Sequence, residues 1–579
     1  MTNRILGFSA WFHDSSACLI EDGKLVAFAE EERFSRRKHS PEFPKSAIEY
    51  CLKSAGGIRL DEVDSVVFYL NPRLLVRSNI EHVLRFFPKS LNLFRKDTTV
   101  VPIKERYRNL FSIKQILCEQ FGAKGDFKLV ELPHFLTHQG AAFLCSPFKD
   151  SAVMTMDVAV DGTTQTIAHG TDNRIKTLLK HSLPHGWGML YSLFTQYVGF
   201  KYYDEYKVMG MAAYGEPKYV DFIEDRLYRL NDESGAFSLN LDYFSFQHYG
   251  MRRIWDERFL RELGPARDPS KPLVQRDYDM AASAQLATER FGLRMARIAK
   301  RLTGADNLCL AGGVVQNVLM NQKIVESGIF KQVFVQPLAS DVGCSLGGAL
   351  YHYHCTLKQP RQYVMEHLYY GPDYKSEYED ALSRNALVFK RLDDPAPAIA
   401  RAVADGAVVG FFCGRMEAGP RALGGRSIIA DPRRQDMKDT LNLRVKHREH
   451  FRPFAPSCLE EHVDEVFETV PDCPSYRYMV MTMKVRPEWH ERLPTITHND
   501  GTARVQAVSR ESNSLYWNVI NEFRKLTGVP LVVNTSFNDN EPIVCTPQDA
   551  INCFKRTHME LLVFENYLVY RSDNPQLQQ

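Results

Sequence analysis

Short apolar runs alternate with long amphipathic segments along most of this chain. Apolar runs at 63–70, 151–160, 307–314 and 332–339 are separated by stretches such as 279–302, whose apolar residues recur at helical spacing. Alternation of this kind is typical of α/β proteins, so we expect strands of a sheet flanked by helices. A chain of 579 residues is long enough to form several domains, each with its own core.

The start of the chain predicts a β-hairpin, and a change of pattern later on predicts a domain boundary. The stretches ILGFSAW (5–11) and LVAFAEEE (25–32), both largely apolar, flank the run ACLI and a turn at Glu21-Asp22-Gly23-Lys24. Residues 355–374 are mixed, aromatic and without clear periodicity. We therefore expect a first domain over 1–370 and a second over 371–579, in which a helix and buried strands recur.

The overall charge makes a nucleic-acid or membrane partner improbable. Lysine and arginine total 72 against 70 acidic residues, a formal net charge of +2, which gives no long-range attraction to polyanions. No stretch approaches the ~20 apolar residues that cross a bilayer. The 12 cysteines are scattered without a C-x-x-C pair, and the amino terminus lacks a signal pattern. We expect small-molecule chemistry in the cytoplasm.

Two histidines follow an apolar run that is typical of a strand. In LPHFLTHQG, Pro133 can open a helix, which would place His134 and His138 one turn apart on the same face. That face could hold a metal ion, although an isolated H-x-x-x-H pattern more often consists of ordinary polar helix residues.

Two aspartates close predicted strands, where open α/β sheets often present ligand-binding groups. Asp157 ends SAVMTMD, and Asp341 ends VFVQPLASD. Either residue could instead cap a helix. Together with His134 and His138 they would supply two imidazoles and two carboxylates, a donor set that suits iron, zinc or manganese better than calcium.

Two loops of the first domain have alternative interpretations. The run from Leu310 to Asn317, which contains Gly312 and Gly313, has the strand, paired glycines and polar helix start of a phosphate cradle. It lacks the Walker lysine and the G-x-G-x-x-G spacing, so a tight structural turn is equally consistent. In the first loop, His13 could be a general base, and Asp14 could be a cap.

The second domain carries the densest signal for anion binding. Within CGRMEAGPRALGGRSIIADPRR, glycines expose backbone N–H groups, and Arg415, Arg421 and Arg426 offer planar forks for phosphate or carboxylate oxygens. Lys446, Arg448 and Arg452 follow at short spacing, and DGTARVQAV adds Arg504. Clustered charge is usually a solvated face. Here glycine, proline and aromatic residues surround the charges, which favours a site for a small phosphorylated molecule.

With these motifs in order, the sequence resembles the NodU/CmcH family of O-carbamoyltransferases over nearly its whole length. The segments that carry the resemblance are FHDSSA (12–17), EEERFSRRKH (30–39), the long stretch 186–217, LAGGVVQN, GPRALGGRSIIADPR, FRPFAPS, DGTARVQAV and NTSFNDNEPIVCTP. The resemblance implies a two-lobed first domain of the actin/sugar-kinase-like fold, similar to the tRNA-threonylcarbamoyl transferase. It implies a second, α/β domain that is YrdC-like and forms carbamoyladenylate.

The resemblance also implies the reaction. Carbamoyl phosphate and ATP, the latter with Mg²⁺, would react in the second domain to give carbamoyladenylate. The first domain would then transfer the carbamoyl group to a hydroxyl of a small acceptor. Enclosing such an anhydride keeps water away from it. A homodimer is implied by resemblance alone.

Residue by residue, the resemblance assigns roles in both domains. His134, His138, Asp157 and Asp341 match the family's metal ligands, with Fe(II) the expected ion, and His13 matches the acceptor base, with Asp14 beside it. The positions that match nucleotide contacts are Lys38, Gly312, Gly313 and Asn317. Those that match the site for carbamoyl phosphate and ATP are Arg421, Lys446, Arg452, Arg504 and Ser536.

This chain departs from the family in two places. Phe135 stands where relatives have a further histidine, which leaves the ligand spacing unchanged. Residues 157–162 lack two glycines of the family's loop, and Asp161 stands where glutamate is expected. The altered loop leaves open an alternative, a regulatory or partner protein that keeps the fold with weakened transfer. A tRNA-directed enzyme is disfavoured by the near-neutral charge and by the fusion of both domains.

Overall fold

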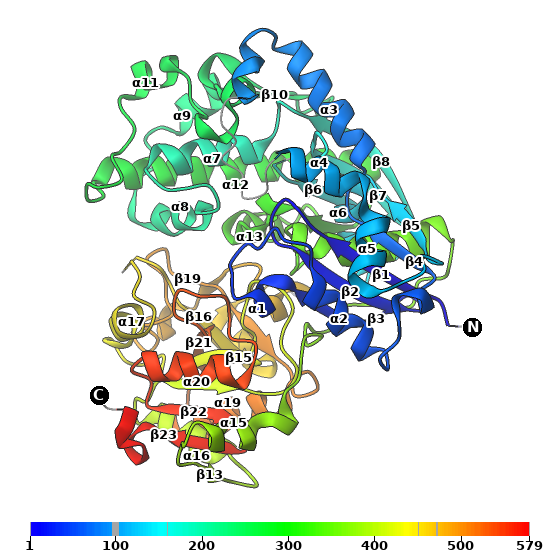
Figure 1. Cartoon of the computed structure of the whole chain (residues 1–579). Coiled ribbons are helices and arrows are strands. Elements are labelled where there is room, and N and C mark those ends of the chain that lie inside the picture. The colour runs from blue at the N-terminus through cyan, green and yellow to red at the C-terminus, as the bar shows by residue number, and fades with distance from the viewer. Residues whose placement is uncertain (1, 95–102, 159, 450, 470–472, 578–579) are drawn as a thin grey trace. The chain divides into compact units, whose positions relative to one another are not determined.

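The chain folds into two units in its computed structural model, which describes residues 2–94, 103–158, 160–449, 451–469 and 473–577 (Figure 1). Unit 1 comprises Met1–Phe28 and Pro41–Val364, and unit 2 comprises Ala29–Ser40 and Met365–Gln579. The short segment Ala29–Ser40 thus precedes most of unit 1 in the sequence but packs in unit 2. In the described part of the chain, no helix is both long enough and apolar enough to span a membrane.

Unit 1 contains two mixed sheets with the same strand topology. The first has the order β3-β2-β1-β4-β5, and the second has the order β12-β11-β6-β7-β8. In each, the first strand pairs antiparallel with the second and parallel with a later strand. The strands of the first sheet are β1 (Arg4–Ser9), β2 (Ser16–Glu21), β3 (Lys24–Glu30), β4 (Ser65–Phe68) and β5 (Lys128–Glu131).

The strands of the second sheet are β6 (Asp150–Met156), β7 (Thr163–Thr171), β8 (Arg174–Ser182), β11 (Asn307–Ala311) and β12 (Gln332–Val335). Repetition of this topology is the actin/sugar-kinase-like arrangement, so the expected fold class is confirmed. The sequence showed no internal repeat because the two halves share strand order but not residue pattern.

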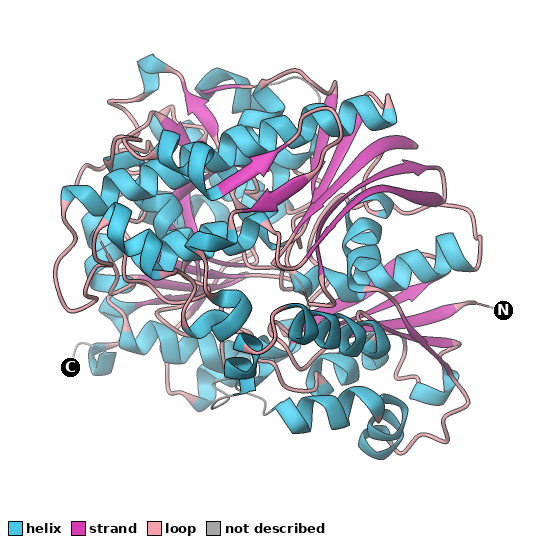
Figure 2. Cartoon of the chain, turned by 90° about the horizontal axis from the view of Figure 1, so that it is seen from above, coloured by secondary structure: helices cyan, strands magenta, loops and turns pink. Residues whose placement is uncertain are grey.

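Helices cover the sheets of unit 1 (Figure 2). The helices of unit 1 include α2 (Lys45–Ser54), α3 (Pro72–Arg85), α4 (Ile103–Phe111), α5 (Ile113–Phe121), α6 (His134–Leu144), α7 (Trp187–Tyr197), α8 (Glu205–Met211), α11 (Glu257–Leu263), α12 (Gln275–Thr303), α13 (Val318–Glu326) and α14 (Cys344–Tyr351). Of these, α2, α6, α7, α12, α13 and α14 pack on strands of the two sheets. The predicted hairpin, the strands at 63–70 and 307–314, and the helix over 279–302 are all confirmed.

One strand end is misplaced in the sequence prediction. β12 ends at Val335, and Asp341 instead begins the 3₁₀ turn η8 (Asp341–Gly343), which leads into α14. Pro337 has no N–H to donate to a sheet, which disfavours continuation of the strand through the rest of the apolar run.

Glycines allow α6 and α14 to pack at backbone contact. A Cβ on Gly347 would lie 1.9 Å from the carbonyl oxygen of Thr137, and one on Gly140 would lie 2.3 Å from the carbonyl oxygen of Gly347. Any side chain at either position would separate the helices. The first turns of α6 and α14 are therefore held side by side, and these turns carry the site residues described below.

Unit 2 is also α/β. Its described residues form a mixed sheet in the order β13-β23-β22-β14-β15-β21-β16-β20 and a small sheet of β17, β18 and β19. The main strands are β14 (Val409–Phe412), β15 (Arg426–Ala430), β16 (Ala455–Leu459), β20 (Gln506–Val508), β21 (Leu531–Ser536), β22 (Leu561–Phe564) and β23 (Tyr567–Tyr570). The edge and small-sheet strands are β13 (Lys390–Arg391), β17 (Phe467–Glu468), β18 (Met483–Val485) and β19 (Thr502–Ala503).

The helices of unit 2 include α1 (Glu31–Ser35), α15 (Tyr378–Arg384), α16 (Ala396–Ala404), α19 (Ser514–Thr527) and α20 (Pro547–Arg556). The helix and strand predicted over 398–415 are confirmed as α16 and β14. Buried ion pairs and hydrogen bonds hold α1 in the unit. Arg33 pairs with Glu30 at 2.6 Å and donates to the carbonyl oxygen of Gly419 at 2.7 Å.

Candidate functional site

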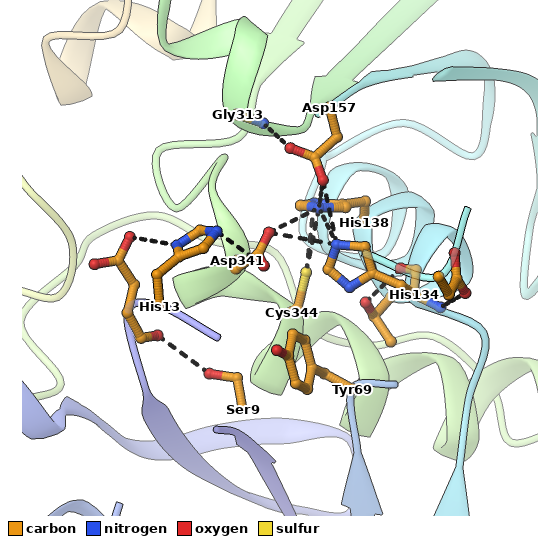
Figure 3. A network of polar contacts seen from close by, with 12 residues as sticks. Ser9, His13, Tyr69, His134, His138, Asp157, Gly313, Asp341 and Cys344 are labelled. Atoms are coloured by element: carbon orange, nitrogen blue, oxygen red, sulfur yellow. Dashed lines mark hydrogen bonds and ion pairs between the residues drawn. The ribbon is translucent and has the colours of Figure 1, made fainter. Parts of the chain in front are cut away.

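The two histidines of the H-x-x-x-H motif occupy the first turns of α6, as the sequence predicted. α6 begins at His134 directly after Pro133, so His134 and His138 share one face of the helix. Both side chains are buried, and their Nε2 atoms lie 3.1 Å apart. The two imidazoles therefore point at one common position (Figure 3).

Two carboxylates face the same position from other elements (Figure 3). Asp157 follows β6, and its Oδ2 lies 3.3 Å from Nε2 of His134 and 3.5 Å from Nε2 of His138. Asp341 begins η8, and its Oδ1 lies 3.3 Å and 3.4 Å from the same two nitrogens. The structure thus brings together all four residues that the sequence assigned to a metal site.

The chemistry of these donors fits a divalent metal ion. Atoms bound at about 2.1 Å to one ion lie about 3.0–3.4 Å from one another, which is close to the separations found here. Burial alone would lower the pKa of His134, but Asp341, Cys344 and Asp157 outweigh it and raise that pKa well above its ordinary value. The cluster therefore favours bound positive charge, either as protons or as a metal cation.

The glycine loop after β11 positions one of the carboxylates. Gly312 has φ +101°, and a Cβ there would lie 2.2 Å from the carbonyl oxygen of Met156. The N–H of Gly313 donates to Oδ1 of Asp157 at 3.2 Å. Asn317 caps α13 by accepting from the N–H of Met320 at 3.0 Å. These contacts are structural, and the assignment of the loop to a nucleotide stays a prediction.

His13 lies beside the cluster and is partly exposed. Its Nδ1 is 3.0 Å from Oδ2 of Asp14, and its Nε2 is 3.4 Å from Oδ2 of Asp341. Asp14 has φ +51°, a left-handed conformation that turns the loop sharply. Burial lowers the pKa of His13, but Asp341 and Asp14 outweigh this and raise it to about 9. His13 therefore holds a proton at neutral pH unless other positive charge offsets these carboxylates.

Two residues that the sequence did not assign complete the surroundings. Cys344 has its Sγ 3.4 Å from Nδ1 and 3.5 Å from Nε2 of His138. Asp161 accepts from the N–H of His134 at 2.8 Å and so satisfies a free donor at the start of α6. The altered 157–162 loop, in which Ala159 lies outside the described residues, thus supports the helix that carries both histidines. A cysteine three residues after Asp341 was the available sequence signal for Cys344.

Unit 2 gathers cations around Lys446 and Ser536. The buried Nζ of Lys446 donates to both oxygens of Asn538, at 2.9 Å and 2.7 Å, and to the carbonyl oxygen of Ser536. Burial lowers the pKa of Lys446 well below its usual range, and Arg448, Lys38 and Arg452 act in the same direction. Lys38 belongs to the segment Ala29–Ser40, so it lies in unit 2, whereas Gly312, Gly313 and Asn317 lie in unit 1.

Two arginines of this cluster are half-buried and have no acidic partner among the described residues. Burial and Arg452 lower the pKa of Arg421 to about 10. Burial together with Arg421, Arg448 and Arg452 also lowers the pKa of Arg504, and its Nε has no hydrogen-bond partner in the described part of the chain. Unpaired charge that is withdrawn from water in part is costly, so the arrangement is suited to a multiply charged anion.

Two other arginines that the sequence assigned to anion binding donate hydrogen bonds to backbone carbonyl oxygens instead. Arg426 is fully buried, lies 3.6 Å over the ring of Phe412 and donates to the carbonyl oxygens of Cys413, Gly414 and Gly425. Arg415 donates to the carbonyl oxygens of Tyr370 and Gly371. The prediction that these two bind a ligand anion is wrong, because carbonyl oxygens occupy their planar forks.

Comparison with known proteins finds similarity along nearly the whole chain. A family model described as carbamoyltransferase N-terminus matches residues 4–350, and one described as carbamoyltransferase C-terminus matches residues 400–571. An uncharacterized protein of Synechocystis sp., sll1178, is 40% identical over 99% of this chain and 98% of its own length. Nodulation protein NolNO of Sinorhizobium fredii is 37% identical over 97% of this chain and 79% of its own length.

Among solved structures, component A of the (R)-2-hydroxyglutaryl-CoA dehydratase of Acidaminococcus fermentans aligns with 61% of this chain and 99% of its own. The identity is 13% and the TM-score is 0.33, values that are too low to carry an inference. The family models, by contrast, cover most of both units and agree with the motifs in their order along the sequence. The chain belongs to the carbamoyltransferase family and is an enzyme of that family.

Proposed function

We propose that this carbamoyltransferase works in two steps that use carbamoyl phosphate and ATP. Unit 2 makes carbamoyladenylate, and unit 1 transfers the carbamoyl group to a hydroxyl of a small metabolite such as a natural product or a sugar-like acceptor. The observation that carries the first step is the set of half-buried Arg421 and Arg504 with buried Lys446, none of which has an acidic partner among the described residues. Two polyanionic reactants would supply the missing negative charge.

The first step balances with one water molecule. Water releases orthophosphate from carbamoyl phosphate and leaves carbamate. A carbamate oxygen then attacks the α-phosphorus of ATP, the bond to the β-phosphate bridge breaks, and pyrophosphate departs with its Mg²⁺. Arg421, Arg452 and Arg504 hold the two anions together against their mutual repulsion, and Lys446 and Ser536 lie at the same place. Lys38 adds a further cation in unit 2.

The second step takes place at the cluster of unit 1. His134, His138, Asp157 and Asp341 would hold a divalent transition metal, with Fe(II) the expected ion, which supplies fixed positive charge next to the adenylate phosphate. The acceptor oxygen attacks the carbamoyl carbon, the bond from that carbon to the AMP oxygen breaks, and the acceptor proton leaves to a base.

His13 is the proposed base. Its Nε2 faces Asp341, and its ring packs against Tyr203 with centroids 5.2 Å apart. The negative charges of Asp341 and Asp14 raise the pKa of His13 and keep the imidazole protonated. The imidazole can therefore accept the acceptor's proton only when a nearby cation offsets these two charges. Base catalysis by His13 therefore depends on a metal ion bound to the cluster of unit 1.

The observations favour a complete enzyme over a regulator that has lost transfer. That alternative depends on the altered 157–162 loop, in which Asp161 stands in place of the expected glutamate. Asp161 nevertheless supports the N–H of His134 at 2.8 Å, and the four predicted ligands converge. The loop change is compatible with an intact site.

Pyrophosphate release tests the first step. The full-length chain with ATP, Mg²⁺ and carbamoyl phosphate should release pyrophosphate, and Arg421→Ala should reduce the rate at least about 100-fold because a charge contact to the reacting phosphates is lost. Arg434→Ala is the matched control, because Arg434 is an exposed arginine of unit 2 that pairs with Asp436 at 2.8 Å. Equal loss in both variants, or none in Arg421→Ala, would contradict the assignment.

A further inference from the structure

Cys344 is the first residue of α14, and its side chain faces the cluster of His134, His138 and Asp341. One ligand atom from each of these four buried residues can be chosen so that all lie within 4.8 Å of one another. The sulfur lies 3.5 Å from Nε2 of His138, the same nitrogen that faces both carboxylates. A thiol is thus part of the inner surface of the candidate metal site.

The position of Cys344 is fixed by its surroundings. Gly140 and Gly347 bring α6 and α14 into backbone contact, which holds the first turn of α14 against His138. On the other side, the hydroxyl of Ser345 lies 2.8 Å from that of Ser16, which also donates to the carbonyl oxygen of Val342 at 2.7 Å. These contacts fix the backbone of Cys344 beside His138, and rotation about its Cα–Cβ bond sets the direction of the thiol.

The sulfur lies 3.4 Å from Nδ1 and 3.5 Å from Nε2 of His138, so it rests against the imidazole ring, and a turn about its Cα–Cβ bond is needed to bring it beside an ion held by Nε2. A sulfur at about 2.3 Å and a nitrogen at about 2.0–2.1 Å from one ion lie between about 3 Å and 4 Å apart when they are neighbours in its coordination shell. Figure 3 shows Asp157 and Cys344 approaching the two imidazoles from opposite sides. Cys344 thus occupies a direction that the other donors leave open.

We propose that Cys344 is a further metal-binding residue, whose sulfur joins His134, His138, Asp157 and Asp341 in a mixed nitrogen, oxygen and sulfur donor set. The proposal rests on the metal site of the proposed function. When the sulfur–metal bond forms, the thiol proton passes to solvent, so metal uptake releases a proton from this side chain.

A sulfur ligand would change which ions the site prefers. Thiolates favour zinc and other softer transition ions, whereas carboxylates and water suit magnesium and manganese. With Cys344 in the donor set, the site should bind Zn²⁺ and Co²⁺ much more tightly than Mn²⁺. Replacing Cys344 by alanine should narrow the difference in affinity between these ions by about tenfold or more. Residues that only hydrogen-bond to a metal ligand already change metal affinity by that amount when they are replaced.

Cobalt is the most direct probe of a bound thiolate. The full-length chain, freed of metal by chelation and reloaded with Co²⁺ without oxygen, should show a sulfur-to-cobalt charge-transfer band in the near ultraviolet. Cys344→Ala should lose the band yet keep bound cobalt through its remaining ligands. Cys145→Ala is the matched control, since Cys145 is also a buried free thiol and directly follows α6, and it should keep the band.

X-ray absorption on the zinc-loaded unmodified chain makes the test independent of any variant. The proposal predicts a sulfur at about 2.3 Å beside nitrogen and oxygen ligands at about 2.0–2.2 Å. A shell of nitrogen and oxygen only, or a cobalt band that persists in Cys344→Ala, would show Cys344 to be a packed thiol and overturn the proposal. Failure of the unmodified chain to bind either metal would overturn the metal site as well, while pyrophosphate release reports on unit 2 separately.

Discussion

The Nε2 atoms of His134 and His138 lie 3.1 Å apart, and both face the carboxylates of Asp157 and Asp341. Two imidazole nitrogens at this distance share at most one proton in a direct hydrogen bond, so a bound cation would pair with the imidazole lone pairs and carboxylate oxygens that converge here. This relationship separates the candidate metal site from the many His–Asp pairs that only support a fold.

His134→Ala should remove bound transition metal and reduce carbamoyl transfer by about 100-fold or more, because the ligand set loses an imidazole. Pyrophosphate release in unit 2 should stay unchanged. Metal content by mass spectrometry and product formation are the measurements. His169→Ala is the control, since its Nε2 pairs with Asp150 at 2.9 Å in a more exposed part of unit 1. Loss of metal from both variants would argue for general disruption.

Arg504→Met should abolish pyrophosphate release without destabilising the protein. Removing a half-buried cation that has no acidic partner relieves its desolvation cost and its repulsion from Arg421 and Arg452. The melting temperature without ligand should be equal or higher, and ATP should raise it less than in the unmodified chain. A clear drop in the ligand-free melting temperature would mean that Arg504 is structural.

Gly347→Ala should destabilise unit 1 by about 3 kcal/mol or more, the upper end for overpacking, because its Cβ would meet backbone atoms of α6. Gly348→Ala is a close control, since its nearest contacts are side-chain methyl groups at 3.2 Å and 3.3 Å. Urea unfolding should show a much lower midpoint for the first variant than for the second. Similar midpoints would contradict the tight crossing of α6 and α14.

Stability should fall with acidification through His352. Burial, reinforced by Lys128, lowers the pKa of this histidine to about 4 in the folded chain. Below about pH 6.5 the unfolded chain binds a proton that the folded chain does not, so unfolding becomes easier as the pH falls toward 4. The contribution is up to about 3 kcal/mol.

Unfolding free energies of the unmodified chain and His352→Gln, measured between pH 7 and pH 4.5, check this expectation. The variant should show a shallower decline, whereas replacing the exposed His558 in the same way should leave the decline unchanged. Identical slopes for the unmodified chain and His352→Gln would contradict a buried neutral imidazole.

Local sequence signals were sufficient for part of the site. The four-residue spacing of His134 and His138 after Pro133 predicted a shared helix face, and the run SAVMTM predicted that Asp157 follows a strand; both features are confirmed. These features depend on helix and strand periodicity alone, which single sequences display.

Other features depend on tertiary packing that the sequence does not display. Arg421 and Arg426 stand five residues apart in the same glycine-rich segment, yet only Arg426 turns inward to the carbonyl oxygens of the loop that follows β14. Cys344 joins the histidines only because Gly140 and Gly347 let two helices touch. Likewise, nothing in residues 29–40 indicates that they pack with a unit that begins more than three hundred residues later.

The position at which ATP is cleaved tests the central claim most directly. The full-length, metal-loaded chain should convert ATP to AMP and pyrophosphate only when carbamoyl phosphate is present, with orthophosphate released in equal amount. Phosphorus NMR distinguishes these products from those of a kinase-like reaction. Formation of ADP, or ATP cleavage that does not depend on carbamoyl phosphate, would contradict the assignment of carbamoyladenylate synthesis to unit 2.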